Sequence, residues 1–143
     1  MNQHFEPTKA QLQALMALPA DQPVAVLNLF QFNQTANYQP EDPEHGTDAA
    51  NISGEEAYQR YGAIAGKVID KLGGRVAMSA AVDQMLIGPE ETDWHIAAIM
   101  FFPSRAAFMQ MMADSDFQAA SRHRKAALAN HHMLHLDGSS FVS

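Results

Sequence analysis

The sequence has 143 residues, of which 47% are hydrophobic and 17% charged, and its formal net charge is -7. A chain of this size and composition can bury a core, which predicts one folded domain rather than a disordered segment. The acidic balance argues against nucleic acid or an anionic membrane as partners, and the lack of cysteine excludes disulfides, thiolate nucleophiles and cysteine metal ligands.

The first part of the chain, residues 1–21, predicts a short helical extension. The opening MNQHFEPTK is too polar for a signal peptide, and no apolar run reaches the roughly 18 residues that a membrane span needs. A T-K-A-Q capping-box pattern begins a helix over residues 8–17, with Leu12, Leu15 and Met16 on one face. We expect this helix to brace the domain, and we expect a cytoplasmic protein.

The first strand is predicted at residues 23–32, PVAVLNLFQF, and both of its faces are largely apolar. Asn28 is the one polar residue on its face, between Val26 and Phe30. A buried amide needs partners, so Asn28 either bonds neighbouring backbone or faces a cavity. Residues 33–52 follow without periodicity, and two interpretations fit this long connection equally well: a flap near a pocket and a tolerated surface insertion.

The middle of the chain predicts a helix followed by a hairpin. An S-G-E-E capping box places Ser53 at the start of a helix over residues 53–72, whose apolar stripe includes Tyr61. Strands are predicted at residues 75–87 and 94–102. The GPEET turn between them makes the pair antiparallel.

The last part predicts a helix in two pieces and a final strand. Ser104 is a natural N-cap, and the S-D-F-Q capping box predicts a second helix start at Ser115. The second piece carries Arg124 on its apolar stripe, so this side chain is expected to turn inward. A short strand at residues 131–136 and a polar tail at residues 137–143 complete the chain.

The resulting order, β-α-β-β-α-β, predicts an α+β fold of the ferredoxin-like type within a single domain. Residues 22–136 form this core, with a four-stranded antiparallel sheet and both helices on one face. Three of the four strands are apolar on both sides, and an uncovered apolar face of that size would promote aggregation. We therefore expect a homodimer in which two such faces pack together.

Several segments, in this order, resemble one known family. They are VLNLFQF on the first strand, GEEAYQRYG and GGR on the first helix, DQMLIG, the FPSRAAF corner, and D-x-x-F-Q with the later H-R. Over residues 22–136 they resemble the domain of unknown function 1330 family, in the dimeric α+β barrel superfamily. The resemblance implies the same ferredoxin-like dimer and no settled activity.

The Arg122-His123-Arg124 cluster is the densest cationic group of the chain. Adjacent helical positions point about 100° apart, so these side chains cannot all address one ligand. For the inward Arg124, the favoured interpretation is an ion pair with Asp83 or Asp93 inside the protein. The alternative is that it holds an anionic ligand.

The superfamily resemblance also implies a monooxygenase that needs no cofactor or degrades haem. Enzymes of this kind use an Asn on the first strand, a Trp on a sheet strand and a His on the second helix. In this chain Asn28, Trp94 and His123 occupy elements of those kinds.

Three histidines form the pattern H-H-x-x-H in the final strand. Alternation places His131 and His135 on one face and His132 on the other, so at most two could share a metal. A solvated edge strand is the favoured interpretation. Phosphate-binding loops, nucleophile elbows and H-E-x-x-H are absent from the sequence, and we expect neither a metal nor a cofactor.

Together these patterns indicate a homodimeric α+β barrel protein that binds a small organic molecule in a cleft between sheet and helices. Any reaction would be acid-base or cofactor-independent, with Asn28, Tyr61 and His123 as candidate catalytic residues. Arg124 and Trp94 are candidate ligand-binding residues. The alternatives are the monooxygenase and a non-catalytic dimerisation or binding module.

Overall fold

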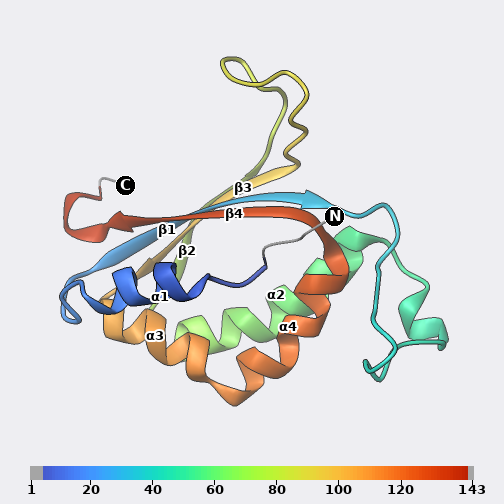
Figure 1. The fold of residues 1–143 in the computed structure, drawn as a ribbon, viewed down its shortest axis with the longest axis horizontal. Coiled ribbons are helices and arrows are strands. Elements are labelled where there is room, and N and C mark those ends of the chain that lie inside the picture. The colour runs from blue at the N-terminus through green and yellow to red at the C-terminus, as the bar shows by residue number, and fades with distance from the viewer. Residues whose placement is uncertain (1–4, 142–143) are drawn as a thin grey trace.

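The fold is a four-stranded antiparallel sheet with helices α2, α3 and α4 on one of its faces (Figure 1). The computed structural model describes residues 5–141. The elements are α1 (Lys9–Met16), β1 (Val24–Phe32), η1 (Asp48–Ala50), α2 (Gly54–Lys71), β2 (Arg75–Ala81), β3 (Ile96–Phe102), α3 (Arg105–Ala113), α4 (Ser115–Ala127), β4 (Leu128–Asp137) and η2 (Gly138–Ser140). The strand order is β2-β3-β1-β4, which confirms the predicted α+β class and agrees with the ferredoxin-like order.

The sheet face beneath the helices carries two apolar clusters. Alternation along β1 directs Val24, Val26, Asn28 and Phe30 to this face, and all four are buried. One cluster contains Val24, Val26, Val68, Ile69, Phe102, Ala107, Phe108 and Met111. The other contains Phe30, Tyr38, Ala57, Ala98, Ala126, Ala127 and Leu128. Asn28 therefore lies on β1 at the boundary between the two clusters.

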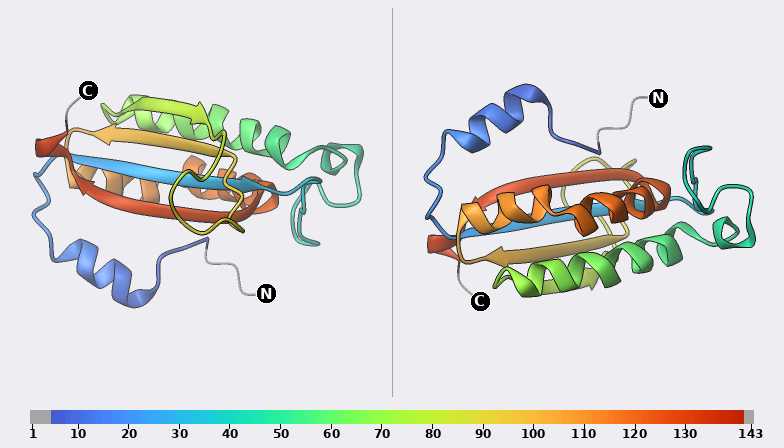
Figure 2. Two further views of the ribbon diagram at one scale, coloured as in Figure 1. Left: turned by 90° about the horizontal axis from the view of Figure 1, so that it is seen from above. Right: turned by 90° about the horizontal axis from the view of Figure 1, so that it is seen from below.

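The opposite sheet face is apolar and open. The register places Leu27 and Leu29 of β1 beside Leu134 of β4 and Ile99 of β3, all pointing away from the helices. Leu134 is 57% exposed, and Leu27, Leu29 and Ile99 are only partly buried. Viewed from above, no helix covers these strands (Figure 2). The predicted apolar second face is thus present within the described part of the chain.

The connection between β2 and β3 is longer than the sequence predicted. β2 ends at Ala81 and β3 begins at Ile96, so the two strands are shorter than expected. The last ladder bonds are those from Val82 N to His95 O and from His95 N to Phe30 O. β1 ends two residues beyond Phe30, so residues further along the hairpin have no third strand to pair with. They rise instead as an arm on the side opposite the helices (Figure 1).

Three of the four predicted helix starts are confirmed by their caps. Ser53 and Ser104 accept backbone hydrogen bonds as expected, and α1 has its capping box. The fourth start is wrong by one residue, because Asp114 caps α4 and Ser115 is already helical. The Asp114 carboxylate accepts from the amides of Asp116 and Phe117, two charge-assisted bonds that a serine hydroxyl does not match.

The N-terminal helix is a weaker brace than predicted. Only Leu15 packs against the core, while Leu12 and Met16 are exposed. Figure 2 shows α1 standing apart from the sheet and the other helices. Of the helices in the described residues, none is both long and apolar enough to cross a membrane.

Candidate functional site

Asn28 lies at the centre of the sheet and is fully engaged in hydrogen bonds. Its Oδ1 is 2.9 Å from Nε2 of His131, and its Nδ2 donates to Val26 O over 3.3 Å. Nδ2 also lies 3.1 Å from the sulfur of Met100, which fills the space on that side. Asn28 therefore holds His131 in place. Its amide has no atom left for a ligand, which weakens a catalytic role for it.

His131 is a neutral imidazole with a fixed tautomer. Nε2 must carry the hydrogen, because the amide oxygen of Asn28 can only accept. Nδ1 is left as an acceptor, 3.4 Å from Nη1 of Arg124. Burial, together with the charge of Arg124, lowers the pKa of His131 to about 3. The ring is thus a poor base at neutral pH, and it is not the solvated edge histidine that the sequence suggested.

Arg124 is a buried cation, and within residues 5–141 its charge acts on the carboxylate of Glu6, which forms its ion pair with Lys125 instead. Its residue is 8% exposed, and its closest polar contact is the neutral His131. No carboxylate of residues 5–141 forms an ion pair with it, and Asp93 instead lies 3.5 Å from His95. The predicted inward orientation is correct, whereas the favoured ion pair with Asp83 or Asp93 is wrong. A buried charge without a counter-ion is energetically unfavourable, which makes this guanidinium an unusual feature of the core.

Two tyrosines from α2 lie close to Arg124. The ring centroids of Tyr58 and Tyr61 are 5.4 Å apart, and burial raises the pKa of Tyr61 to about 12. Burial also raises the pKa of Tyr58, and the charge of Arg124 opposes both shifts. Neither hydroxyl has a hydrogen bond within the described residues. The polar side-chain atoms there that are both without a hydrogen bond and fully buried are Arg105 Nε and His135 Nε2, so neither tyrosine hydroxyl is fully buried. Both hydroxyls therefore keep some access to solvent.

Aromatic rings form the walls around these polar groups. The Phe30 ring has Tyr58 on one side and His131 on another, each at a centroid distance of 4.7 Å. Phe117 contacts Tyr61 at 5.8 Å. Arg124, His131, Tyr58 and Tyr61 thus form a polar cluster with aromatic walls between the sheet and helices α2 and α4, and we call it the Arg124 site.

His123 belongs to a different group of residues. Its Nδ1 shares a hydrogen bond of 2.7 Å with the hydroxyl of Tyr38, while Arg60 donates to the same hydroxyl oxygen over 3.4 Å. Burial, with Arg122 nearby, lowers the pKa of His123. These contacts, with the two bonds from Arg122 to Glu44 at 2.9 Å each, attach the 33–52 segment to α4. His123 therefore serves to dock this segment.

Trp94 lies against the opposite face of the sheet. Its ring centroid is 4.7 Å from that of His132, which pairs with Leu29 and points away from the helices. Asn28 points toward the helices, so these two residues are separated by the sheet. The structure does not bring Asn28, Trp94 and His123 together, and Trp94 does not reach the Arg124 site.

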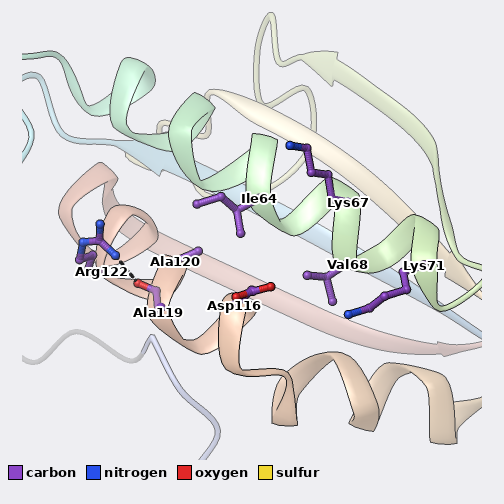
Figure 3. Close-up of a pocket in the computed structure, with 8 residues that line it drawn as sticks. All are labelled: Ile64, Lys67, Val68, Lys71, Asp116, Ala119, Ala120 and Arg122. Atoms are coloured by element: carbon purple, nitrogen blue, oxygen red, sulfur yellow. Dashed lines mark hydrogen bonds between the residues drawn. The ribbon is translucent and has the colours of Figure 1, made fainter.

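A groove also lies between α2 and α4 (Figure 3), with a volume of about 470 Å³. Lys67 and Lys71 of α2 and Asp116 and Arg122 of α4 line it. Lys71 is paired with Asp114 at 3.0 Å and Arg122 with Glu44, so most of its cationic charge is already neutralised. None of the predicted site residues lines this groove.

Sequence reasoning missed His131 and Tyr58 as members of the Arg124 site. His131 was noted only as a possible metal ligand, because a strand pattern gives the face of a residue but not its partner across the sheet. The pairing of Phe30 with His131 places the imidazole next to Asn28, and this register comes from the fold. Among the described residues, no group of three or more His, Cys, Asp or Glu side chains could hold a metal.

Comparisons with known proteins agree with this description. Residues 48–138 match the family model described as domain of unknown function (DUF1330). The crystal structure of RPA0582, a protein of unknown function from Rhodopseudomonas palustris, is 32% identical with a TM-score of 0.82, over 95% of this chain and 97% of that one. Methylated RPA0582 is 33% identical with a TM-score of 0.84, over 96% of each chain.

None of the curated proteins matches this chain. The family model covers more than half of the sequence, and the two RPA0582 structures match along nearly its whole length. The resemblance noted from the sequence is thus confirmed, and the chain belongs to the DUF1330 family.

Proposed function

We propose that this protein is a homodimer of the α+β barrel type in which each subunit binds a small organic acid at the Arg124 site. The acid lies between the sheet and helices α2 and α4. Its carboxylate pairs with the guanidinium of Arg124, and its apolar body packs against Phe30 and Phe117.

The observation that carries the proposal is the buried guanidinium of Arg124, which forms no ion pair within residues 5–141. Guanidinium groups bind carboxylates through two parallel N–H donors, and among the contacts of the described residues only Nη1 is engaged, in a long contact to His131. The hydroxyls of Tyr58 and Tyr61 are further unoccupied donors nearby. A carboxylate would supply the missing counter-charge and accept hydrogen bonds from these groups.

The same groups favour binding over acid-base catalysis. His131 stays neutral at physiological pH, and Arg124 occupies its acceptor nitrogen. Tyr61, with a pKa of about 12, rarely carries the negative charge that a base requires. A general base matched to neutral pH is thus absent from the described residues of the site.

The homodimer is supported by the open sheet face. Leu27, Leu29, Ile99, Phe101 and Leu134 form a continuous apolar surface on three adjacent strands. Such a surface on a soluble monomer promotes association, and sheets with apolar faces commonly pack on each other. The same face of a second copy is self-complementary under two-fold symmetry.

The ligand is tested by calorimetric titration with benzoate, phenylacetate and hexanoate, and with benzamide and phenylacetamide as uncharged counterparts. We expect at least one acid to bind about tenfold or more tightly than its amide, a difference of about 1.4 kcal/mol. The Arg124→Gln variant should lose this preference. Lys67→Gln, which removes an exposed charge of α2 that forms no ion pair within residues 5–141, should keep it.

Two results would overturn the ligand proposal. One is equal affinity for acids and amides. The other is that no acid binds and native mass spectrometry of the purified protein finds no retained small molecule. The latter result, combined with a dimer, identifies a dimerisation module without a ligand. Sedimentation of a clean monomer at micromolar concentration would overturn the dimer.

A further inference from the structure

The connection between β2 and β3 forms an arm that stands away from the body of the protein. It spans residues 82–95 and rises on the open side of the sheet (Figure 1). At its tip Leu86 is 79% exposed and Ile87 is 90% exposed, more than any other large apolar residues of the described chain. Two adjacent aliphatic side chains in water at the end of a projection are characteristic of a contact surface.

The base of the arm is anchored to the sheet. Val82 N donates to His95 O over 2.9 Å, and Phe32 N donates to Nδ1 of His95 over 2.9 Å. Trp94 is buried against the ring of His132. These contacts orient the arm away from the sheet and hold it there.

The tip has a defined turn. Gly88 adopts a φ of +136°, a conformation that residues with side chains rarely adopt. A Cβ at this position would lie 2.7 Å from the sulfur of Met85. Met85 thus packs on the turn itself, and Leu86 and Ile87 are left pointing outward.

We propose that the arm clasps the second copy of this chain, burying Leu86 and Ile87 against the partner. The inference rests on the dimer proposed above. The arm and the open apolar face lie on the same side of the sheet, so a copy that covers the face must come to lie beside the arm. Two-fold symmetry gives each subunit an arm on the other.

The length of the arm determines where it reaches. Six residues from Val82 to Ile87 extend at most about 20 Å, whereas two packed sheets lie about 10 Å apart. An arm that rises by more than half of this maximum passes the plane of the partner's sheet, so we place the tip against the partner's flank, outside the sheet-to-sheet interface. The arm also carries Asp83, Glu90, Glu91 and Asp93 and no Lys or Arg, which disfavours an anionic membrane as the occupant.

The test uses cysteine chemistry, because the chain has no cysteine of its own. An Ile87→Cys variant is labelled with a maleimide-benzophenone reagent and irradiated. We expect a covalent species of twice the chain mass, with the crosslinked peptide mapping to the other chain. The matched control, Ala119→Cys, places the same label on the helix layer and should give no such product.

A second variant measures affinity. Leu86→Ser together with Ile87→Ser should raise the dimer dissociation constant by about tenfold or more, measured by sedimentation. The circular dichroism spectrum should not change, because both side chains are exposed in the subunit.

Three results overturn the inference. Sedimentation of the unaltered chain shows whether the dimer itself fails or only the clasp. A monomeric unaltered chain removes the dimer and the clasp together. A dimer that gives no interchain crosslink, and whose affinity is unchanged in the double variant, removes only the clasp. Binding to phosphatidylcholine or phosphatidylglycerol vesicles that the double variant loses identifies a membrane as the occupant instead.

Discussion

The amide oxygen of Asn28 accepts a hydrogen bond of 2.9 Å from Nε2 of His131, and this bond joins the neighbouring strands β1 and β4 beneath the helices. It fixes the hydrogen on Nε2 and leaves Nδ1 facing Nη1 of Arg124. Protonation of the imidazole would add a second positive charge beside the guanidinium. The folded protein therefore requires His131 to be neutral.

The first prediction concerns the pH dependence of stability. The pKa of His131 falls from an ordinary 6.5 to about 3 on folding. Between these values the unfolded chain binds more protons than the folded one, so stability decreases as pH falls from 6.5 toward 3. His131 contributes up to about 1.4 kcal/mol per pH unit to this decrease in the free energy of unfolding. Urea unfolding at pH 7, 6, 5 and 4 should show a shallower decrease for His131→Gln than for the unaltered chain.

Comparing His131→Gln with the unaltered chain separates the effect of His131 from that of other groups whose titration also lowers stability as pH falls. The bond to Arg122 holds the pKa of Glu44 at about 2, and burial lowers the pKa of His123. Both groups are present in the variant and in the unaltered chain, so the difference in slope belongs to position 131. Equal slopes would contradict the assignment.

The second prediction contrasts two arginines that lie two residues apart. Arg124→Met removes a buried charge without a counter-ion and should leave the free energy of unfolding unchanged or raise it by about 1 kcal/mol. Arg122→Met breaks the two bonds to Glu44 and should lower the free energy of unfolding by on the order of 1 kcal/mol. Urea denaturation at pH 7 measures both variants. A larger loss at position 124 than at 122 would mean that Arg124 has a stabilising partner.

The third prediction contrasts two tyrosine hydroxyls. Tyr61→Phe removes a hydroxyl without a hydrogen bond, so stability should change by less than about 0.5 kcal/mol while affinity for an organic acid decreases. Tyr38→Phe leaves Nδ1 of the buried His123 without its hydrogen-bond partner, which should lower the free energy of unfolding by about 1–2 kcal/mol. Thermal unfolding and calorimetric titration of both variants distinguish the two roles. Equal stability losses would show that Tyr61 is a structural residue.

The fourth prediction concerns two glycines of α2. A Cβ at Gly54 would lie 2.6 Å from the backbone oxygen of Ala127 and still closer to that of Asn33, so Gly54→Ala should lower the free energy of unfolding by about 2 kcal/mol or more. Gly62 has no atom within 4 Å of the corresponding point. Gly62→Ala should therefore raise stability by about 0.5–1 kcal/mol through its helix propensity. Denaturant titration of the pair checks the predicted change of sign.

Local sequence patterns predicted the elements of this fold well. The caps at Ser53 and Ser104 follow from side-chain bonds within one turn, which a sequence shows directly. The alternating pattern of β1 predicted two apolar faces, and both are present. The hairpin was harder, because VDQMLI reads as a strand by composition but has no neighbouring strand beyond Ala81.

The Arg124 site was only partly predictable, for a related reason. The helical stripe indicated that Arg124 turns inward. Its partner, however, depends on the register in which β4 pairs with β1. The structure sets Phe30 opposite His131, which places an imidazole where a carboxylate had been expected. Long-range register decides such contacts, and no local pattern encodes it.

The direct junction of α4 and β4 has a consequence for how a ligand would be received. α4 ends at Ala127 and β4 begins at Leu128 without a loop between them, and Asn33 and Asn37 donate backbone bonds to Ala127 and Ala126. The residues on either side of the junction, Arg124 and His131, are therefore held on one stiff piece of chain. The site is preorganised, so little conformational entropy remains to be lost on binding and the backbone should move by less than about 1 Å.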